Sequence, residues 1–329
     1  MTSINWGIIS TAKIGINHVI PAIQESETGT VHAIASRDSE KAKKAADDLK
    51  IPVSYGSYED LLADDSIDAI YNPLPNHLHV PWTIKAMEAG KHVLCEKPIA
   101  LDADEAEALL RKTREFPDLK VMEAFMYRFH PQWTEARKLV TNREIGSIKS
   151  IHSVFSYYND NPDDIRNRPN IGGGGLMDIG CYCISISRFL FGEEPDRVFG
   201  ELDMDPDFNV DRKASGILAF GDKTATFTCS TQMQNYQRVS VFGTDGMIEI
   251  EIPFNAPSDQ STRIYLTKGG EKDAIEIPAA RQYTLQADAF GEAIINDTAV
   301  PTPLEDAVAN MKVIDAMFKS GKQHSAITM

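Results

Sequence analysis

The sequence predicts an α/β protein of two domains, in which a parallel sheet is followed by an open, mostly antiparallel sheet. The chain has 329 residues, a length typical of about two domains. In the first third, apolar strand-like runs alternate with helix-like segments, an order typical of a parallel sheet with helices on both faces. Beyond residue 150, short strand-like runs follow one another. The boundary is placed so that the predicted domains are residues 1–123 and 124–329.

The first domain is predicted as strands and helices in strict alternation. Short apolar runs predict strands over residues 5–10, 31–36, 69–72, 92–96 and 121–124. Between these runs, helices are predicted over residues 14–24, 39–49, 58–63, 80–89 and 102–114. Ser39 is the expected N-cap of the second helix, and Gly90 follows the fourth as a C-terminal glycine. Alternation of this kind builds βαβ units.

The second domain begins with an alternating strand over residues 150–158, a polar loop and a run of four glycines, Gly172 to Gly175. A helix is predicted to follow the glycines over residues 176–191. Further strands are predicted over residues 198–203, 214–220, 225–231, 238–243, 247–252 and 262–267, and final helices over 285–296 and 304–320. Turns such as 244–246, Thr-Asp-Gly, suit hairpins, so this sheet is expected to be antiparallel.

Charge and cysteine content exclude several classes of protein. With 33 Lys and Arg against 48 Asp and Glu, the net charge of −15 argues against a nucleic acid or membrane partner, although a local basic pocket for an anionic small molecule is compatible with it. The four cysteines lack metal-ligand spacing, so no metal is expected. The N-terminus has no basic segment of a signal peptide, and no apolar stretch reaches about 18 residues. A cytoplasmic location is therefore expected.

The turn after the first strand is a candidate phosphate-binding loop. Its candidate residues are Ser10, Thr11, Ala12, Ile14 and Gly15. In a Rossmann fold this turn follows G-x-G-x-x-G and directs backbone N–H groups at a pyrophosphate. Here Ser10 and Ala12 occupy the first two glycine positions and only Gly15 matches. An ordinary strand–helix turn also needs small residues, but the position in a βαβ unit favours nucleotide binding.

The end of the second strand indicates which dinucleotide would bind. A site for NAD usually carries Asp or Glu there, to bond the ribose hydroxyls. This chain has Ser36 and Arg37, with Lys41 one turn into the next helix, and these groups suit a 2′-phosphate. The alternatives are a solvated arginine at a strand end and an Asp38 that reaches the ribose. NADP is favoured over NAD.

Three sequence stretches carry a resemblance to a known family. They are residues 75–79 with 89–98 (ending Cys-Glu-Lys-Pro), residues 123–131 (Glu-Ala-Phe-Met-Tyr-Arg-Phe-His-Pro) and residues 172–182 (four glycines, then Leu-Met-Asp-Ile-Gly-Cys-Tyr). Through them the chain resembles the glucose–fructose oxidoreductase/inositol dehydrogenase (Gfo/Idh/MocA) family over nearly its whole length. The resemblance is nearest to the branch of NADP-dependent D-xylose dehydrogenase and dimeric dihydrodiol dehydrogenase. It implies an N-terminal Rossmann domain and a C-terminal α/β domain.

The resemblance implies three catalytic residues, which are Lys97, Asp178 and Tyr182. Oxidation of an alcohol needs a base for the hydroxyl proton, and Tyr182 can act if a cation lowers its pKa from about 10. Lys97 is the expected cation, while Asp178 is expected to orient Lys97 or a substrate hydroxyl. A histidine replaces Tyr182 in the inositol branch, which makes inositol a less favoured substrate. The alternative for Tyr182 is a core tyrosine with a satisfied hydroxyl.

Further residues are implied at the site. Pro73, Leu74, Asn76, His79, Glu96, Lys97 and Arg166 are expected near the cofactor, and Arg128, His130 and Asp178 near the substrate. His79 has the alternative of a histidine satisfied at a helix start. Arg128 and His130 have the alternative of a structural role at the domain boundary. The aromatics Phe155 and Tyr157, which alternate along a strand, are interpreted as core residues.

Together, these residues and the family resemblance predict an oxidoreductase that acts on CH–OH groups. It would pass a hydride between NADP and a carbinol carbon of a sugar, such as the aldose D-xylose, or of a vicinal diol. A non-catalytic NADP(H)-binding regulator on the same fold is the alternative, and the co-occurrence of Lys97, Asp178 and Tyr182 favours the enzyme. A homodimer or higher homo-oligomer is expected through the outer face of the C-terminal sheet. Thr226, Thr228, Ser230 and Gln232 suggest that this face is rather polar.

Overall fold

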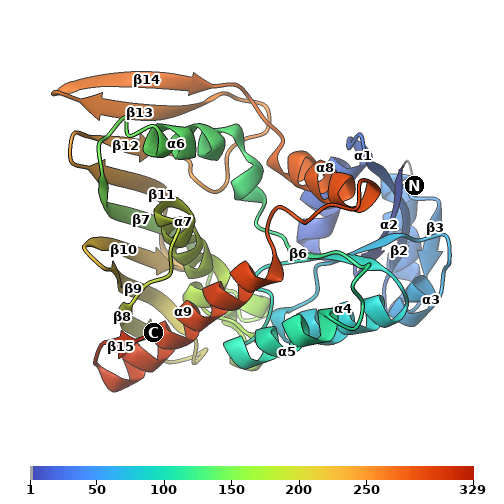
Figure 1. Cartoon of the computed structure of the whole chain (residues 1–329). Helices are drawn as coiled ribbons and strands as arrows, with labels where there is room; N and C mark the ends of the chain where they lie inside the picture. The colour runs from blue at the N-terminus through green and yellow to red at the C-terminus, as the bar shows by residue number, and fades with distance from the viewer. Residues whose placement is uncertain (1–2) are drawn as a thin grey trace. The chain divides into compact units, whose positions relative to one another are not determined.

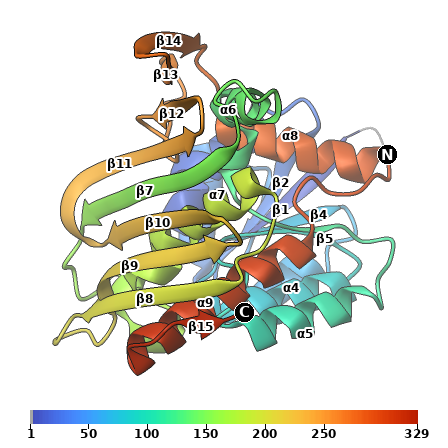
Figure 2. The same ribbon diagram turned by 60° about the vertical axis from the view of Figure 1, so that its left-hand side comes forward.

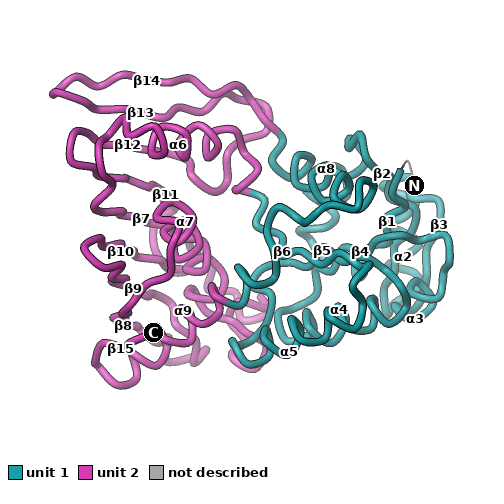
Figure 3. Tube along the Cα trace, viewed as in Figure 1, with its two compact units in different colours: residues 1–126, 281–308 teal, residues 127–280, 309–329 magenta. Residues whose placement is uncertain are grey.

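The computed structural model describes residues 3–329 and divides into two compact units (Figures 1 and 3). Unit 1 comprises Met1–Met126 and Arg281–Val308, and unit 2 comprises Tyr127–Ala280 and Ala309–Met329. The sequence placed the whole chain beyond residue 123 in the second domain. The compact units instead include residues 281–308 in the N-terminal unit, because that segment packs on the parallel sheet.

Unit 1 contains a six-stranded parallel sheet. Its strands are β1 (Ile4–Ile9), β2 (Gly29–Ala35), β3 (Val53–Tyr55), β4 (Ala69–Asn72), β5 (His92–Cys95) and β6 (Val121–Glu123). In the strand order β3-β2-β1-β4-β5-β6, β2 and β3 are added on one side of β1 and β4 to β6 on the other, so the order of the strands reverses between β1 and β4. This order is that of the Rossmann fold, in which ligands bind beside the reversal at the carboxyl ends of the strands. The predicted parallel sheet is confirmed.

The helices of unit 1 lie on both faces of this sheet, with α4 and α5 packed together on one face and α8 on the other (Figures 1 and 2). They are α1 (Ile20–Gln24), α2 (Ser39–Leu49), α3 (Tyr58–Leu62), α4 (His79–Glu88), α5 (Ala103–Thr113) and α8 (Gln282–Ile295), with a 3₁₀ turn η2 (Asn76–Leu78) before α4. The helix predicted over 14–24 is a π-turn, η1 (Gly15–Val19), followed by α1. The predicted cap of α2 was wrong: the carboxylate of Asp38, one residue earlier, accepts the N–H groups of Glu40 and Lys41.

The return of the chain to unit 1 is fixed by side-chain contacts of α8. Asp288 accepts hydrogen bonds from the Ser26 hydroxyl at 2.5 Å and from the backbone N–H of Glu27 at 2.9 Å. The rings of Trp6 and Phe290 contact each other with centroids 5.7 Å apart. These partners lie more than 260 residues apart in the sequence, so no local pattern reveals them.

Unit 2 contains a nine-stranded sheet in the order β14-β13-β12-β11-β7-β10-β9-β8-β15. Its strands are β7 (Ile148–Tyr158), β8 (Arg197–Met204), β9 (Asp211–Phe220), β10 (Lys223–Ser230), β11 (Gln232–Gly243), β12 (Gly246–Ile250), β13 (Thr262–Lys268), β14 (Glu271–Ile277) and β15 (Ile327–Thr328). The pair β7–β10 is parallel and the other pairs are antiparallel. The prediction of a mostly antiparallel sheet is confirmed.

Helices cover one face of this sheet, and Figure 2 shows α7 behind the strands β7 to β10. The helical segments that lie wholly or mostly in unit 2 are η3 (Met126–Phe129), α6 (Pro131–Thr141), η4 (Ile165–Asn167), η5 (Pro169–Ile171), η6 (Leu176–Gly180), α7 (Cys181–Phe191) and α9 (Leu304–Gln323). Two glycines allow α9 to approach closely, because a Cβ at Gly200 or Gly216 would lie 2.9 or 2.8 Å from the methyl carbon of Met317. Within residues 3–329, no helix has both the length and the apolar character required to cross a bilayer.

Candidate active site

The predicted cofactor residues of unit 1 lie on segments that leave one edge of its sheet. Ile9, at the end of β1, pairs with Ala35, and Asn72, at the end of β4, pairs with Cys95. Because the strands are parallel, the segments after them emerge at the same edge. These segments carry Ser10, Thr11, Ala12, Ile14 and Gly15 after β1, then Ser36, Arg37 and Lys41 after β2, then Pro73, Leu74, Asn76 and His79 after β4, and Glu96 and Lys97 after β5.

The first turn adopts a conformation suited to a nucleotide loop. Ser10 has a φ of 79°, in the left-handed region that glycine usually occupies, and its N–H donates to the Ala35 carbonyl at 2.8 Å. Ser10 therefore makes the bend that the first motif glycine makes elsewhere. Gly15 is less constrained, because a Cβ there would find its nearest neighbour, a ring carbon of Tyr71, at an ordinary 3.6 Å.

The end of β2 presents exposed cations. Arg37 is exposed, and Lys41 lies one turn into α2 with its ammonium 3.7 Å from the Asp38 carboxylate. Asp38 caps α2, so its carboxylate is already engaged by backbone N–H groups. The Ser36 hydroxyl accepts the N–H of Asp38 at 3.2 Å. The arrangement leaves the guanidinium of Arg37 at the sheet edge, where a phosphate group can pair with it.

His79 connects two of the loops at this edge. Its Nε2 lies 2.6 Å from the carbonyl oxygen of Leu74 and its Nδ1 lies 2.7 Å from that of Pro98. Burial lowers the pKa of His79 to about 4, and this effect outweighs the two carbonyl groups, which favour the cation. Both ring nitrogens contact the protein itself, and Pro98 follows Lys97 through a cis peptide bond. His79 therefore fixes the backbone beside Lys97.

Two carboxylates that flank Lys97 also fix this backbone. Glu96 accepts the hydroxyl of Tyr71 at 2.7 Å and the N–H of Lys97 at 3.3 Å. Glu123, which is buried, accepts the N–H of Ile99 at 2.8 Å. Burial raises the pKa of Tyr71 well above its usual value, so the phenol remains a donor. No local sequence pattern identifies Tyr71 or Glu123 as supporting residues, because their partners lie 25 and 24 residues away.

Asp178 is the centre of a polar cluster in unit 2. Its Oδ2 accepts the hydroxyl of Tyr157 at 2.5 Å and lies 3.0 Å from Nε of Arg166. The pKa of Arg166 is raised, chiefly by the charge of Asp178, so the pair is ionic. Burial, followed by the Asp178 charge, raises the pKa of Tyr157. Arg166 was expected near the cofactor, and here its guanidinium contacts Asp178 and Asp164. Tyr157 was interpreted as a core residue, but its hydroxyl donates a hydrogen bond to Asp178.

Tyr182 lies in the first turn of α7, four residues after Asp178. It is 5% exposed, and its ring contacts those of Tyr127, Phe155 and Phe254 at centroid distances of 5.6, 5.7 and 5.3 Å. An aromatic cage of this kind fixes the ring plane and excludes water from one side of it. The structure thus places Tyr182, Asp178 and Arg166 on neighbouring segments of unit 2.

Arg128 and His130 make contacts within unit 2 that correspond to the structural alternative. Nη2 of Arg128 donates to the Ser185 hydroxyl at 2.7 Å, and the guanidinium lies 5.4 Å from the ring centre of Phe189. His130 caps α6, where its Nδ1 accepts the N–H of Gln132 at 3.2 Å. Burial lowers the pKa of His130 to about 4, so the ring is a neutral acceptor near neutral pH.

A pocket of about 520 Å³ adjoins the Asp178 cluster in unit 2. Its lining residues are Phe155, Ser156, Tyr157, Asn235, Tyr236, Gln237, Arg238, Glu251 and Asn255. The only cation among them, Arg238, is paired with Glu249 and Glu251 at 3.1 Å each. An aromatic wall with amide groups and no uncompensated charge suits an uncharged polyol. Across residues 3–329, no group of three or more His, Cys, Asp or Glu side chains has metal-binding geometry.

Comparison with known proteins agrees with these features. Residues 4–124 match the family described as "Oxidoreductase family, NAD-binding Rossmann fold", and residues 133–249 match the "GFO/IDH/MocA C-terminal domain". The chain is 44% identical over 329 residues to the uncharacterized oxidoreductase ORF334 of Rhizobium meliloti, and the match covers 98% of each chain. It is 39% identical over 326 residues to D-xylose 1-dehydrogenase (NADP(+)) 2 of Haloferax volcanii, covering 98% of this chain and 99% of that one.

A solved structure gives the same fold. The 3-ketoreductase KijD10 of Actinomadura kijaniata, in complex with NADP and TDP-benzene, matches with a TM-score of 0.91 and 29% identity. The match covers 97% of this chain and 98% of that chain. Together with the two family matches, this similarity extends over both units of the molecule. The chain belongs to the GFO/IDH/MocA oxidoreductase family.

Proposed function

We propose that this protein is an NADP-dependent oxidoreductase that transfers a hydride between the nicotinamide and a carbinol carbon of a sugar, such as an aldose, or of a vicinal diol. The observation that carries the proposal is the Asp178 cluster beside Tyr182, in a chain whose other unit has a Rossmann sheet edge. The xylose dehydrogenase, whose name includes both a sugar and NADP(+), and the 3-ketoreductase, whose structure contains NADP, support this proposal.

The sheet edge of unit 1 fits NADP. The left-handed turn at Ser10 allows a close backbone approach to a pyrophosphate, and Arg37 with Lys41 offers cations for a 2′-phosphate. When bound, NADP supplies or accepts the hydride at its nicotinamide ring. The residues of this chain then orient the partners and transfer the proton.

Proton transfer is assigned to Tyr182. In the oxidative direction, with NADP⁺ bound to accept the hydride, the hydroxyl proton of the substrate would pass to the oxygen of Tyr182 as the carbonyl group forms. The proposal requires the Lys97 ammonium to favour the phenolate form that accepts this proton. Asp178 orients the reacting hydroxyl, and its own position is fixed by Tyr157 and Arg166. A non-catalytic regulator has no use for such a cluster, and burying an ion pair is costly.

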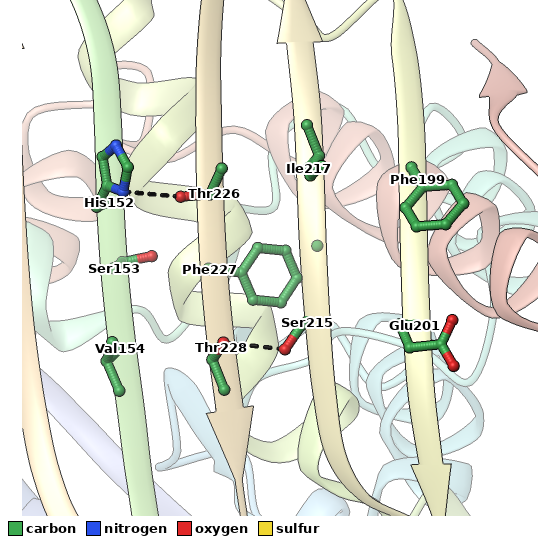
Figure 4. A pocket seen from close by; sticks show the side chains of 11 residues that line it. His152, Ser153, Val154, Phe199, Glu201, Ser215, Ile217, Thr226, Phe227 and Thr228 are labelled. Atoms are coloured by element: carbon green, nitrogen blue, oxygen red, sulfur yellow. Dashed lines mark hydrogen bonds between the residues drawn. The ribbon is translucent and has the colours of Figure 1, made fainter.

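We also infer that the uncovered face of the unit 2 sheet joins a second copy of this chain. A shallow hollow of about 400 Å³ lies on this face, across β7 to β10 (Figure 4). Its rim combines Phe199 and Ile217, which are 37% and 47% exposed, with the polar side chains of Thr226 and Thr228. Large exposed apolar side chains on a flat sheet are typical of an interface. A homodimer or higher homo-oligomer follows from this inference.

The decisive assay follows the absorbance of reduced nicotinamide with a panel of aldoses and diols. We expect turnover with at least one of them, and with NADP⁺ in preference to NAD⁺. Arg37→Ala should weaken NADP⁺ binding by roughly 10- to 100-fold, because a charge-assisted bond worth about 1.5–3 kcal/mol is lost, and leave NAD⁺ binding nearly unchanged. Tight NADP binding without turnover of any member would support the regulator instead.

A further inference from the structure

We propose that Asp211, the first residue of β9, is a positioning residue for proton transfer, because its carboxylate fixes the start of the helical segment that carries Asp178 and Tyr182. The inference rests on the function proposed above. Asp211 does not touch the reacting atoms and acts through the backbone of η6. No sequence motif identified it, since its partner lies 35 residues away.

The contact is a long-range helix cap. Oδ2 of Asp211 accepts the N–H of Leu176 at 2.6 Å, and the carboxyl also accepts a backbone hydrogen bond from Gly175. The first N–H groups of a helical segment lack partners of their own, and η6 has no capping side chain from its own segment. Asp211 is 1% exposed, so water cannot replace it in this role. The strand β9 therefore supplies the cap that η6 lacks.

The run of glycines is adapted to this carboxylate. Gly174 has a φ of 113°, and a Cβ on it would collide with Oδ1 of Asp211. A Cβ on Gly173 would lie 2.6 Å from the carbonyl oxygens of Arg166 and Arg168. The glycines thus bring the chain against Asp211 on one side and against the Arg166 segment on the other.

The cap is linked to Asp178 within one turn. The N–H of Asp178 donates to the carbonyl of Gly174 at 3.0 Å, so residues 174–178 move as a unit with the capped backbone. Tyr182 follows on the same helical segment. Displacement of reacting groups by about 1 Å costs roughly 100-fold in rate. Loss of the cap should therefore reduce turnover with little effect on the nucleotide edge.

The carboxyl group of Asp211, which forms the cap, is itself titratable. Burial raises the pKa of Asp211 to about 7, while the N–H groups of Leu176 and Gly175 oppose this rise. The thiol of Cys229 on β10 interacts electrostatically with this carboxyl group, and it stays neutral because burial raises the pKa of the thiol well above its usual value. Protonation removes part of the acceptor capacity of the carboxyl. Turnover should consequently decline as the pH falls through about 7.

The test compares Asp211→Asn with Asp205→Asn as a matched control. Asp205 is also buried and also caps a turn, accepting the N–H groups of Asp207 and Phe208 at 2.8 and 3.0 Å, but that turn carries no proposed catalytic residue. We expect Asp211→Asn to lower kcat by roughly 10- to 100-fold, to keep NADP affinity within about twofold, and to abolish the decline near pH 7. Asp205→Asn should retain kcat and the pH profile.

Amide hydrogen exchange at residues 175–178 provides a readout that does not depend on activity. Faster exchange there in Asp211→Asn, but not in Asp205→Asn, supports the cap, and unchanged exchange together with wild-type kcat overturns it. If Asp211→Asn does not fold, wild-type exchange at Leu176 is measured from pH 5.5 to 8.5 instead. Exchange at low pH that is faster than the chemical rate accounts for, which makes the pH profile shallower than that of the chemical rate, supports the inference, whereas a profile parallel to that of the chemical rate contradicts it. Absence of wild-type turnover on every substrate would contradict the proposed function and leave this exchange test decisive.

Discussion

At the scale of single residues, the candidate site depends on one carboxylate. Asp178 accepts a hydrogen bond from the phenol of Tyr157 and pairs with the guanidinium of Arg166, so its charge is compensated before any substrate binds. A preorganised carboxylate can orient a substrate hydroxyl without further rearrangement. The motif made Asp178 and Tyr182 recognisable in the sequence. Tyr157 and Arg166 acquire their roles only through contacts across 21 and 12 positions, which alternation along a strand does not reveal.

Tyr157→Phe tests this dependence. The substitution removes one hydroxyl that donates to a carboxylate, and hydrogen bonds to charged groups contribute about 1.5–3 kcal/mol. We expect kcat to fall by roughly 10-fold or more, with NADP affinity unchanged, in steady-state assays. Tyr158→Phe is the matched control. Tyr158 is 65% exposed, and its hydroxyl donates a long hydrogen bond of 3.4 Å to Asp160. Equal rates for the two variants would refute the role assigned to Tyr157.

His79 predicts a pH dependence of stability. Its pKa is about 4 in the folded protein and 6.5 in the unfolded chain, so the unfolded chain binds the extra proton in between. The free energy of unfolding should therefore decrease as the pH falls from about 6.5 to about 4, by an amount on the order of 3 kcal/mol. Urea unfolding of the wild type and His79→Gln across this range measures the effect. A slope of the same size in His79→Gln would show that other groups cause it.

At the scale of elements, α8 shows what a single boundary along the chain leaves out. The alternation of strands and helices was sufficient to predict the parallel sheet of unit 1, because both periodicities are local. The return of residues 281–308 to that sheet depends on Asp288 and on the Trp6–Phe290 contact. The antiparallel sheet was likewise predictable from short strands and turns, whereas the parallel pair of β7 with β10 required the tertiary structure.

Asp288→Ala should loosen α8 from unit 1. Asp288 accepts the Ser26 hydroxyl and backbone N–H groups at residues 27 and 28, which would lose their partner. We expect a loss of about 1–3 kcal/mol in the free energy of unfolding. Asp297→Ala is the control, since Asp297 is 86% exposed and solvent screens its ion pair with Lys120, so its loss should have little effect on stability. Denaturant titration distinguishes them, and equal losses would contradict the account of α8.

At the scale of the whole molecule, the two units divide the proposed chemistry. Unit 1 carries the nucleotide edge and Lys97, while unit 2 carries Tyr182, the Asp178 cluster and the uncovered sheet face. Composition and motifs were sufficient to predict this division of labour, because each motif lies within one segment of the chain. Composition and motifs were not sufficient to predict which segments belong to each unit, since the chain crosses between the units more than once.

The uncovered face should mediate self-association. Ile217→Asp places a charge beside Phe199 on the rim of the hollow, where a second copy would have to desolvate it. Sedimentation of the wild type at micromolar concentration should give a dimer or higher oligomer, and the variant should shift toward the monomer. Lys268→Asp, on the distant strand β13, should leave the distribution unchanged. A wild type that sediments as a single monomeric species would overturn the inference.

The most direct test of the central claim is the single-turnover rate of hydride transfer in Tyr182→Phe, Lys97→Met and the double variant. Tyr182→Phe removes one hydroxyl, so the fold and NADP binding should persist while the rate falls by roughly 100- to 10,000-fold. Lys97→Met should fall at least as far, and the double variant should be little worse than either, because residues that act as a unit are not additive. A Tyr182→Phe variant with the wild-type rate, beside an inactive Lys97→Met variant, would instead make Lys97 the proton carrier and contradict the mechanism.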